Sequence, residues 1–293
     1  MHWVGSRSYG MTLVALAGVL WSTGGLFVRA LESLDLRTMV AWRSMFAALA
    51  LAVVIVAFNR SRSLDAFRRL GWPGLVAIPI ALVSMTSFIV AVWLTTVANV
   101  MIVYATVPFI AAGIGFLWNG ERPSRRMLMA AAVAFLGVAI MAGASASLDD
   151  LMGCAVALLM TVTFATQLVM ARRYPALEMA PVNGAGAALC AVVFFPFAAA
   201  QIPDAQQLVI LLLFGIATTA GAYVLFLVGG RYIPSGEAGL VGMIDVVLAP
   251  LWVWLLFDEQ PGSAALVGGV IVLAAVLWYL GAELRLRASA GRA

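Results

Sequence analysis

The sequence contains almost none of the residues that form metal sites and catalytic centres. Its single histidine is His2, in the N-terminal tail, and its two cysteines, Cys154 and Cys190, lie inside apolar stretches. Two isolated cysteines in such surroundings predict neither a disulfide nor a metal site, and we expect them to pack as small hydrophobic side chains. A histidine-dependent catalytic mechanism is therefore excluded, and we expect no metal and no cofactor.

Charged residues are also scarce, and lysine is absent. Only 10% of the 293 residues are charged, while 64% are hydrophobic and the mean hydropathy is +1.06. Soluble domains carry about a quarter charged residues, and one globule of this length cannot bury so much apolar surface. The chain is therefore predicted to cross a lipid bilayer several times. The net charge of +4 comes from short arginine clusters between apolar runs, which does not indicate nucleic acid binding.

Long polar segments are missing as well. No loop between apolar runs exceeds about 15 residues, and there is no Gly-rich phosphate-binding loop with lysine. The longest predicted cytoplasmic loop, about 59–71, is too short for the output domain that a receptor normally carries. Any function must therefore lie within the membrane-embedded helices.

The apolar runs have the length of transmembrane helices. A bilayer core of about 30 Å needs roughly 20 apolar residues per helix. The runs are continuous and do not alternate, which excludes the strands of an outer-membrane barrel. The first run starts near Tyr9 and has no small-residue cleavage motif, which favours a retained span over a signal peptide. We predict an all-α integral membrane protein with ten transmembrane helices, near 9–31, 37–58, 72–93, 97–118, 125–143, 150–170, 180–200, 206–229, 234–256 and 262–282.

The arginines predict the orientation of these helices. If both termini are cytoplasmic, 14 of the 17 arginines fall in the terminal tails and the cytoplasmic loops. Every predicted cytoplasmic loop then contains arginine, as the positive-inside rule requires. We therefore predict a multi-pass protein of the bacterial inner membrane with cytoplasmic N and C termini.

The two halves of the chain resemble each other. Residues 118–123 close the fourth predicted helix as 256–261 close the ninth, and each helix contains a proline, Pro108 or Pro250. Each half has five helices, so the second copy must cross the membrane in the opposite direction. Inverted repeats of this kind are typical of transporters. The predicted repeats are residues 1–145 and 146–293, which together form a single membrane domain.

Three motifs resemble those of the drug/metabolite transporter superfamily. They are Gly120 to Pro123, Leu20 to Ser22, and the stretch from Ile233 to Gln260, which contains Asp245 to Trp252 and then Asp258 and Glu259. Within that superfamily the chain is similar to the EamA branch, and there to the bacterial aromatic amino-acid exporters. It departs from the family pattern at three positions, where Asp245 replaces Glu, Val246 replaces Pro and Asp258 replaces Gly.

The resemblance covers essentially the whole chain and implies a particular arrangement of the helices. The first four helices of each half would surround a central cavity, and the fifth and tenth would pack outside them. The composition of these two helices agrees, because small residues at three- and four-residue spacing permit close helix packing in lipid. They are Ala130, Ala131, Ala132, Ala134 and Gly137 in the fifth helix, and Ala264, Ala265, Gly268, Gly269, Ala274 and Ala275 in the tenth.

Polar and aromatic residues lie at mid-membrane depth in the helices expected to line the cavity. A mostly apolar pocket with few polar anchors suits a small amphiphilic solute. It suits a sugar phosphate poorly, because the sequence has no cluster of buried arginines. Each candidate has the alternative of facing lipid or packing in the core. The candidate substrate-binding residues are Trp21, Ser22, Ser84, Phe88, Met101, Tyr104, Thr163, Gln167, Tyr223 and Asp245.

Two carboxyl groups of the ninth predicted helix are candidates for proton coupling. Asp245 is expected near its middle, where a carboxylate costs about 3 kcal/mol, so the side chain should face the bundle interior. It could bind a proton or a substrate ammonium, or be a structural carboxyl. Glu237 is expected near the start of the helix, where a carboxylate also suits the positive helix end as a cap. The repeat offset of 138 residues pairs Tyr104 with Gly242, one turn before Asp245.

The membrane depth of Arg43, about two turns into the second predicted helix, allows two roles. We expect it to snorkel to the outer interface or to pair with Asp35 or Glu32. The alternative is a clamp for a substrate carboxylate, since guanidinium matches carboxylate geometry.

These features predict a secondary transporter that works by alternating access. The resemblance implies export of amino acids, aromatic or otherwise apolar, with a multidrug or cationic-compound exporter as the alternative. An enzyme is disfavoured because Asp245 has no intramembrane aspartate partner, and a receptor is disfavoured by the missing output domain. A passive channel stays a minor alternative, because inverted repeats occur in channels too. The expected partners are a small-molecule substrate and the lipid bilayer, with a monomer as the default.

Overall fold

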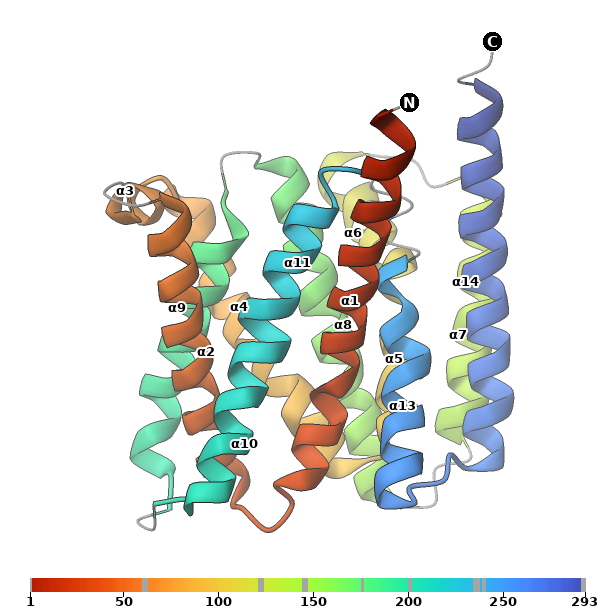
Figure 1. Cartoon of the computed structure of the whole chain (residues 1–293). Coiled ribbons are helices and arrows are strands. Elements are labelled where there is room, and N and C mark those ends of the chain that lie inside the picture. Colours follow the sequence, from red (N-terminus) through yellow and green to blue (C-terminus); the bar gives the residue numbers. More distant parts are fainter. Residues whose placement is uncertain are drawn as a thin grey trace.

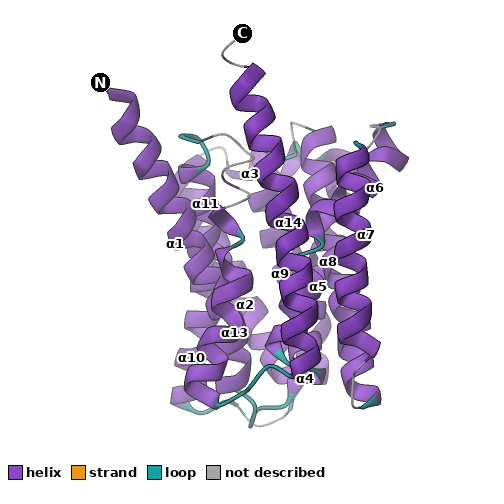
Figure 2. Cartoon of the chain, turned by 90° about the vertical axis from the view of Figure 1, so that its right-hand side faces the viewer, coloured by secondary structure: helices purple, strands orange, loops and turns teal. Residues whose placement is uncertain are grey.

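The chain folds as a bundle of helices. In the computed structural model, the described residues form helices joined by turns and loops, and none of them forms a strand (Figure 2). Those ranges are residues 2–59, 63–120, 124–143, 147–174, 177–199, 202–233, 238 and 241–290. Glu121, Arg122 and Pro123 of the first repeat motif, and Glu237, lie outside them.

The first half contains seven helical segments in its described part. They are α1 (His2–Ala30), α2 (Leu36–Asn59), α3 (Ser63–Arg68), α4 (Gly71–Leu94), α5 (Val97–Tyr104), α6 (Val107–Asn119) and α7 (Arg125–Gly143). The second half contributes α8 (Leu148–Arg173), α9 (Met179–Phe194), the short 3₁₀ segment η2 (Phe195–Phe197), α10 (Ala205–Gly215), η3 (Ile216–Gly221), α11 (Ala222–Gly229), α13 (Ile244–Phe257) and α14 (Ser263–Ala290).

Eight of the predicted segments coincide with long apolar helices, and the ninth and tenth overlap shorter ones. In the described residues, eight helical stretches are long and apolar enough to cross a bilayer, judged by length and composition. Two shorter apolar helices, Ile244–Phe257 and Ser263–Tyr279, lie at the ninth and tenth predicted positions. The start of α1 and the end of α14 lie at the same end of the bundle (Figure 1). Ten crossings with cytoplasmic termini remain a prediction.

Two pseudo-equivalent helices are interrupted at matching positions. The fourth predicted span divides into α5 and α6 at Ala105 and Thr106, and α13 begins after a turn at Met243. The offset of 138 residues pairs Ala105 with Met243. Short backbone bonds keep the amides paired at these breaks, from Thr106 N–H to Val103 O (3.1 Å) and from Val246 N–H to Met243 O (3.1 Å). Discontinuous helices of this kind line the binding sites of many transporters.

The eighth predicted span changes its winding midway. Between α10 and α11, the residues of η3 form a π-helix, whose wider turn accommodates one extra residue. Gly215, just before it, allows α10 to approach α2 closely, because a Cβ there would lie 2.8 Å from Ala47 N and 3.0 Å from Arg43 O. The π turn and the close approach together bring Thr218 and Thr219 next to α2.

Helices α7 and α14 pack against each other at one edge of the bundle (Figure 1). A Cβ on Gly137 would lie 2.8 Å from Gly268 O, and one on Gly268 would lie 2.5 Å from Gly137 O. The two backbones are therefore in direct contact, as the small residues of both helices predict. These are the fifth and tenth predicted helices, and they lie at the outside of the bundle as expected.

The core lies between the two halves, and the outer surface is apolar. Val28, Met39, Val97 and Phe214 are fully or almost fully buried in one cluster that both halves build. Cys154 and Cys190 are buried too, as expected for small apolar side chains. Many large apolar side chains elsewhere are exposed, which suits helices that face lipid and not water.

The contact between α7 and α14 gives a stability prediction. Gly268→Val places a branched side chain against the Gly137 carbonyl, and overpacking of this kind costs about 1–3 kcal/mol. We expect the thermal unfolding midpoint of the detergent-purified protein to fall by about 5 °C. Gly281→Val, in the same helix, is the matched control, because a Cβ there meets no described atom within 4 Å. Equal midpoints for the two variants would contradict the proposed contact.

Candidate functional site

A cavity of about 200 Å³ lies inside the bundle, between the two halves. Its lining comes from α1, α2, α4 and α5 of the first half and from α8 to α11, η3 and α13 of the second. In the described part of the chain, α7 and α14 contribute nothing to it. The lining residues are Trp21, Gly24, Arg43, Leu51, Ser84, Met85, Phe88, Met101, Tyr104, Met160, Phe164, Gln167, Asn183, Phe214, Thr218, Thr219, Tyr223 and Asp245.

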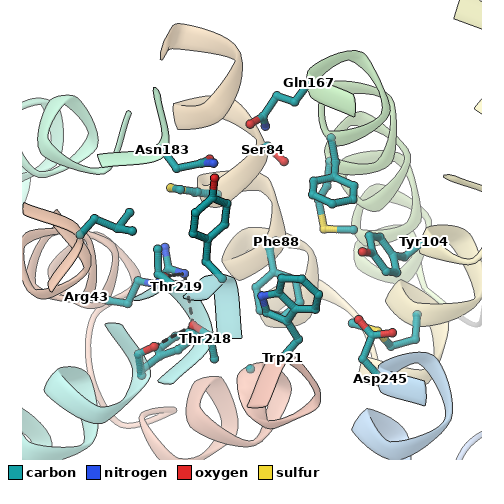
Figure 3. Close-up of a pocket in the computed structure, with 18 residues that line it drawn as sticks. Trp21, Arg43, Ser84, Phe88, Tyr104, Gln167, Asn183, Thr218, Thr219 and Asp245 are labelled. Atoms are coloured by element: carbon teal, nitrogen blue, oxygen red, sulfur yellow. Dashed lines mark hydrogen bonds between the residues drawn. The ribbon is translucent and has the colours of Figure 1, made fainter. Parts of the chain in front are cut away.

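The structure brings eight of the ten candidate substrate-binding residues together around this cavity (Figure 3). The other two, Ser22 and Thr163, are not part of the lining. Ser22 Oγ accepts a hydrogen bond from Trp252 Nε1 (2.9 Å), and the Thr163 hydroxyl donates to Leu159 O (2.8 Å). These hydroxyl groups therefore join helices or bond to their own helix. The eight that line the cavity are Trp21, Ser84, Phe88, Met101, Tyr104, Gln167, Tyr223 and Asp245.

The side chain of Arg43 points into the cavity, and this corrects the expectation that it snorkels or pairs with Asp35 or Glu32. It is 6% exposed, and its Cζ lies 5.0 Å from the centroid of the Phe214 ring. Asp35 instead accepts hydrogen bonds from Thr38 at the start of α2. The sequence gives the depth of Arg43 in the membrane but not the direction in which it faces.

One side of the Arg43 guanidinium is held by two threonines of the π turn. Its Nη2 donates to Thr219 Oγ1 (3.0 Å) and, more weakly, to Thr218 Oγ1 (3.5 Å). Thr218 donates its own hydroxyl proton to Phe214 O (2.7 Å), which leaves its oxygen free to accept. The two remaining nitrogens of Arg43, Nε and Nη1, have no hydrogen-bond partner among the described residues. The guanidinium is therefore positioned but only partly satisfied.

Asp245 occupies a different position in its helix from the one expected. It lies in the first turn of α13, directly after the break at Met243, and not in the middle of a continuous helix. The positive end of the helix dipole favours a carboxylate there. The side chain is 6% exposed, and its Oδ1 atom has no hydrogen-bond partner within the described ranges. Figure 3 shows the carboxyl group directed into the cavity near Tyr104.

Aromatic rings form the middle of the cavity. Figure 3 shows Trp21 and Phe88 between Arg43 on one side and Asp245 on the other. The Trp21 ring packs on Phe226 at 5.3 Å between centroids, and the Tyr104 ring packs on Phe164 at 5.7 Å. Gly24 leaves room for Phe88, whose Cζ would lie 3.0 Å from a Cβ at that position. The site is thus an apolar chamber with a cationic and an acidic group on opposite sides.

Three further polar lining residues, Asn183, Thr218 and Thr219, are absent from the sequence-derived candidates. Apart from Gln206–Gln207 at its start, the Thr218–Thr219 pair is the one polar dipeptide within the apolar run 206–229, and this signal could have identified the pair. Asn183, near the start of α9, donates to Met179 O (2.9 Å) and lines the cavity with its remaining amide atoms.

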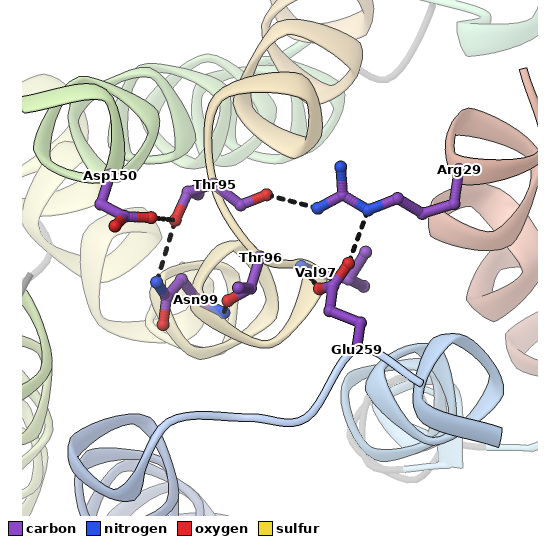
Figure 4. A network of polar contacts seen from close by, with 7 residues as sticks. All are labelled: Arg29, Thr95, Thr96, Val97, Asn99, Asp150 and Glu259. Carbon is purple, nitrogen blue, oxygen red and sulfur yellow. Dashed lines mark hydrogen bonds and ion pairs between the residues drawn. The ribbon is translucent and has the colours of Figure 1, made fainter. Parts of the chain in front are cut away.

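A second polar cluster ties helix ends from both halves together, at the end of the bundle away from the termini (Figures 1 and 4). Arg29 Nε bonds Glu259 Oε2 (2.5 Å), and Arg29 Nη2 donates to Thr95 O (2.8 Å). Glu259 Oε1 accepts from the Val97 backbone amide (2.7 Å), and the Thr95 hydroxyl donates to Asp150 Oδ1 (2.8 Å). We call this cluster the end network. It connects α1, the α4–α5 junction, α8 and the segment after α13.

Comparison with known proteins gives one family and one fold. The sequence profile described as "EamA-like transporter family" matches residues 8–143 and, a second time, residues 151–281. A solved structure superposes with a TM-score of 0.65 over 96% of this chain and 99% of that chain, at 19% sequence identity, which shows a shared fold. The comparison with curated proteins found no match.

The buried Oδ1 atom of Asp245, which has no partner among the described residues, predicts a conflict between stability and function. Asp245→Asn removes the charge but keeps the shape, so we expect the thermal midpoint of the purified protein to rise by about 4 °C, as 1–2 kcal/mol of relief would give. Asp149→Asn, at an exposed position in the first turn of α8, is the control and should not stabilise. A lower midpoint for Asp245→Asn than for the parent would show that the carboxylate has a structural partner.

Proposed function

This chain belongs to the EamA-like transporter family, and we propose that it is a secondary transporter that carries amino acids out across the bacterial inner membrane. The family match spans both halves of the chain and makes it a multi-pass membrane protein of a family that transports small molecules. The finer parts of the proposal are the substrate, the direction of transport and the membrane. They rest on the resemblance to aromatic amino-acid exporters and on the site described above.

The observation that supports the proposal most directly is a cavity to which both halves of the chain contribute. Nine helical segments and the π turn supply its lining, while the α7–α14 pair stays outside. A carrier that alternates its access needs a central site contacted by both halves, so that movement of one half against the other exposes the site to either side. The interruptions at Thr106 and Met243 provide points in both repeats where a helix can bend.

An amino acid fits the chemistry of this site. The aromatic and methionine side chains offer an apolar surface, and Arg43 and Asp245 offer one group for an anion and one for a cation. The second candidate, an exporter of cationic compounds, is favoured by one specific observation. Trp21 lies in the cavity with Asp245, and tryptophan faces bind cations. Asp245 is also our candidate for proton coupling, and Glu237 remains a second candidate on sequence grounds alone.

The end network is proposed to close one entrance. It fastens α1, α8 and the α4–α5 junction to the segment after α13, and its charged pair, Arg29 and Glu259, is mostly shielded from solvent. By the predicted topology it lies on the periplasmic side. Opening of the cavity toward that side would then require the Arg29–Glu259 pair to separate.

The transport proposal predicts saturable counterflow. Vesicles containing the purified protein and a trapped pool of unlabelled amino acid should transiently accumulate the labelled amino acid added outside at trace level. Trp21→Ala and Tyr104→Ala each remove an aromatic wall of the cavity and should lower the initial rate at least tenfold. Trp254→Ala, an exposed tryptophan outside the cavity, is the matched control and should retain the parental rate.

Several results would contradict this proposal. Absence of counterflow for every amino acid, in vesicles that hold folded protein, would overturn the amino-acid assignment and favour the cationic-compound exporter. Flux that does not saturate would indicate a channel. An equal loss of rate in Trp254→Ala would show that the effect of the cavity variants is not local.

The proposed entrance predicts a change in accessibility. In a protein with Cys154→Ala and Cys190→Ala, a Ser84→Cys substitution places one thiol in the cavity. This thiol is labelled with a small membrane-impermeant methanethiosulfonate in right-side-out vesicles. Adding Glu259→Gln should raise the labelling rate about tenfold, because weakening the Arg29–Glu259 pair by about 1.4 kcal/mol raises the open population by that factor. Asp258→Asn, at the exposed neighbouring position, should not. Faster labelling from the opposite face alone would reverse the predicted orientation of the network.

A further inference from the structure

The two charged groups of the cavity do not satisfy each other. Arg43 keeps two guanidinium nitrogens without a partner, and Asp245 keeps one carboxyl oxygen without a partner, in the part of the chain that the structure describes. Both side chains are 6% exposed and line the same cavity. Burial of a charged group whose polar atoms are only partly paired is unfavourable, so a site that retains two such groups is suited to being completed by a ligand.

The arrangement of these groups also restricts the ligand. Figure 3 places them on opposite sides of the cavity, with the Trp21 and Phe88 rings between them. Arg43 is fixed by Thr219 on one side, which leaves its unpaired nitrogens for an acceptor such as a carboxylate. Asp245 is fixed at the start of α13, which leaves Oδ1 for a donor such as an ammonium.

We propose that the cavity selects a solute with an anionic group at one end and a cationic group at the other, separated by an apolar middle. The anionic group binds Arg43, the cationic group binds Asp245, and the middle packs on Trp21 and Phe88. This inference rests on the proposed transport function and narrows its substrate class to dipolar solutes of the ω-amino-acid kind. In an α-amino acid the ammonium and carboxylate groups share one carbon, so we expect it to engage one end of the cavity at a time and to bind more weakly than a solute whose charges are separated.

Two isomers and two single-charge analogues test this selection. The compounds 6-aminohexanoate and 2-aminohexanoate have identical composition and differ in the separation of their charges, while hexanoate and hexylamine each lack one charge. The thermal unfolding midpoint of the purified full-length protein is measured against the concentration of each compound. We expect 6-aminohexanoate to reach its half-maximal shift at a concentration at least tenfold lower than the other three.

Substitutions at each end of the cavity should change this preference in different ways. Arg43→Gln should abolish the preference for 6-aminohexanoate over hexylamine, and Arg43→Lys, which keeps the positive charge, should retain part of it. Asp245→Asn should abolish the preference over hexanoate. Arg37→Gln and Asp149→Asn, both at exposed positions, are the matched controls and should keep the parental order of all four compounds.

The outcomes separate this inference from the transport proposal. Equal half-maximal concentrations for the two isomers, or for 6-aminohexanoate and either single-charge compound, would overturn the selection. A protein that unfolds cooperatively but is shifted by none of the four would also overturn it. Stabilisation by 6-aminohexanoate that depends on both Arg43 and Asp245, without counterflow of that compound, would support the site and reject the carrier function.

Discussion

A backbone amide or carbonyl that leaves a helix inside a bilayer has no water to bond, so it must find a partner within the protein or face an aqueous cavity. The rest of this structure depends on that constraint. The chain interrupts its helices at Ala105–Thr106, at Met243 and through the π turn, and short local bonds satisfy the first two breaks. Lining residues lie at or beside all three interruptions: Tyr104, Asp245, Thr218 and Thr219. These three departures from regular α-helix therefore lie around the cavity, where polar groups can contact a solute or water.

Close backbone contact supports this arrangement from outside the site. Lipid is as apolar as leucine, so helices in a bilayer associate through packing and polar contacts and not through exclusion of water. The Gly137–Gly268 contact fastens α7 to α14 at the edge, and Gly215 lets α10 reach α2 near the π turn. The second of these contacts bears directly on the cavity, because it brings the threonines of η3 to the guanidinium of Arg43. Gly215, which does not line the cavity, therefore helps to determine how the Arg43 side chain is held.

Much of the architecture could be predicted from the sequence, because the length and hydropathy of the apolar runs respond to the bilayer itself. The eight long apolar helices, the outer position of the fifth and tenth predicted helices and eight of the residues that line the cavity were predicted. Arg43 was wrongly expected at the interface, since position along a helix gives depth but not the face on which a residue lies. Asp245 was expected in the middle of a helix because a continuous apolar run conceals a break in the backbone. The residue types of η3 do not indicate a π-helix. Ser22 was expected in the cavity because its hydrogen bond to Trp252, 230 positions away, cannot be seen in the sequence.

The π turn also has a consequence for how such a site can diversify. Each residue of an α-helix turns the chain by about 100°, so the extra residue in Ile216–Gly221 sets the rotation of α11 relative to α10. Loss of one residue there would restore a continuous α-helix and rotate Tyr223 and its neighbours to a new face, without replacing any side chain that lines the cavity. The length of this segment can therefore differ between related chains independently of the residue types that line the cavity. Substrate range could diverge between close relatives by insertion or deletion, in ways that a comparison of aligned residue types would not detect.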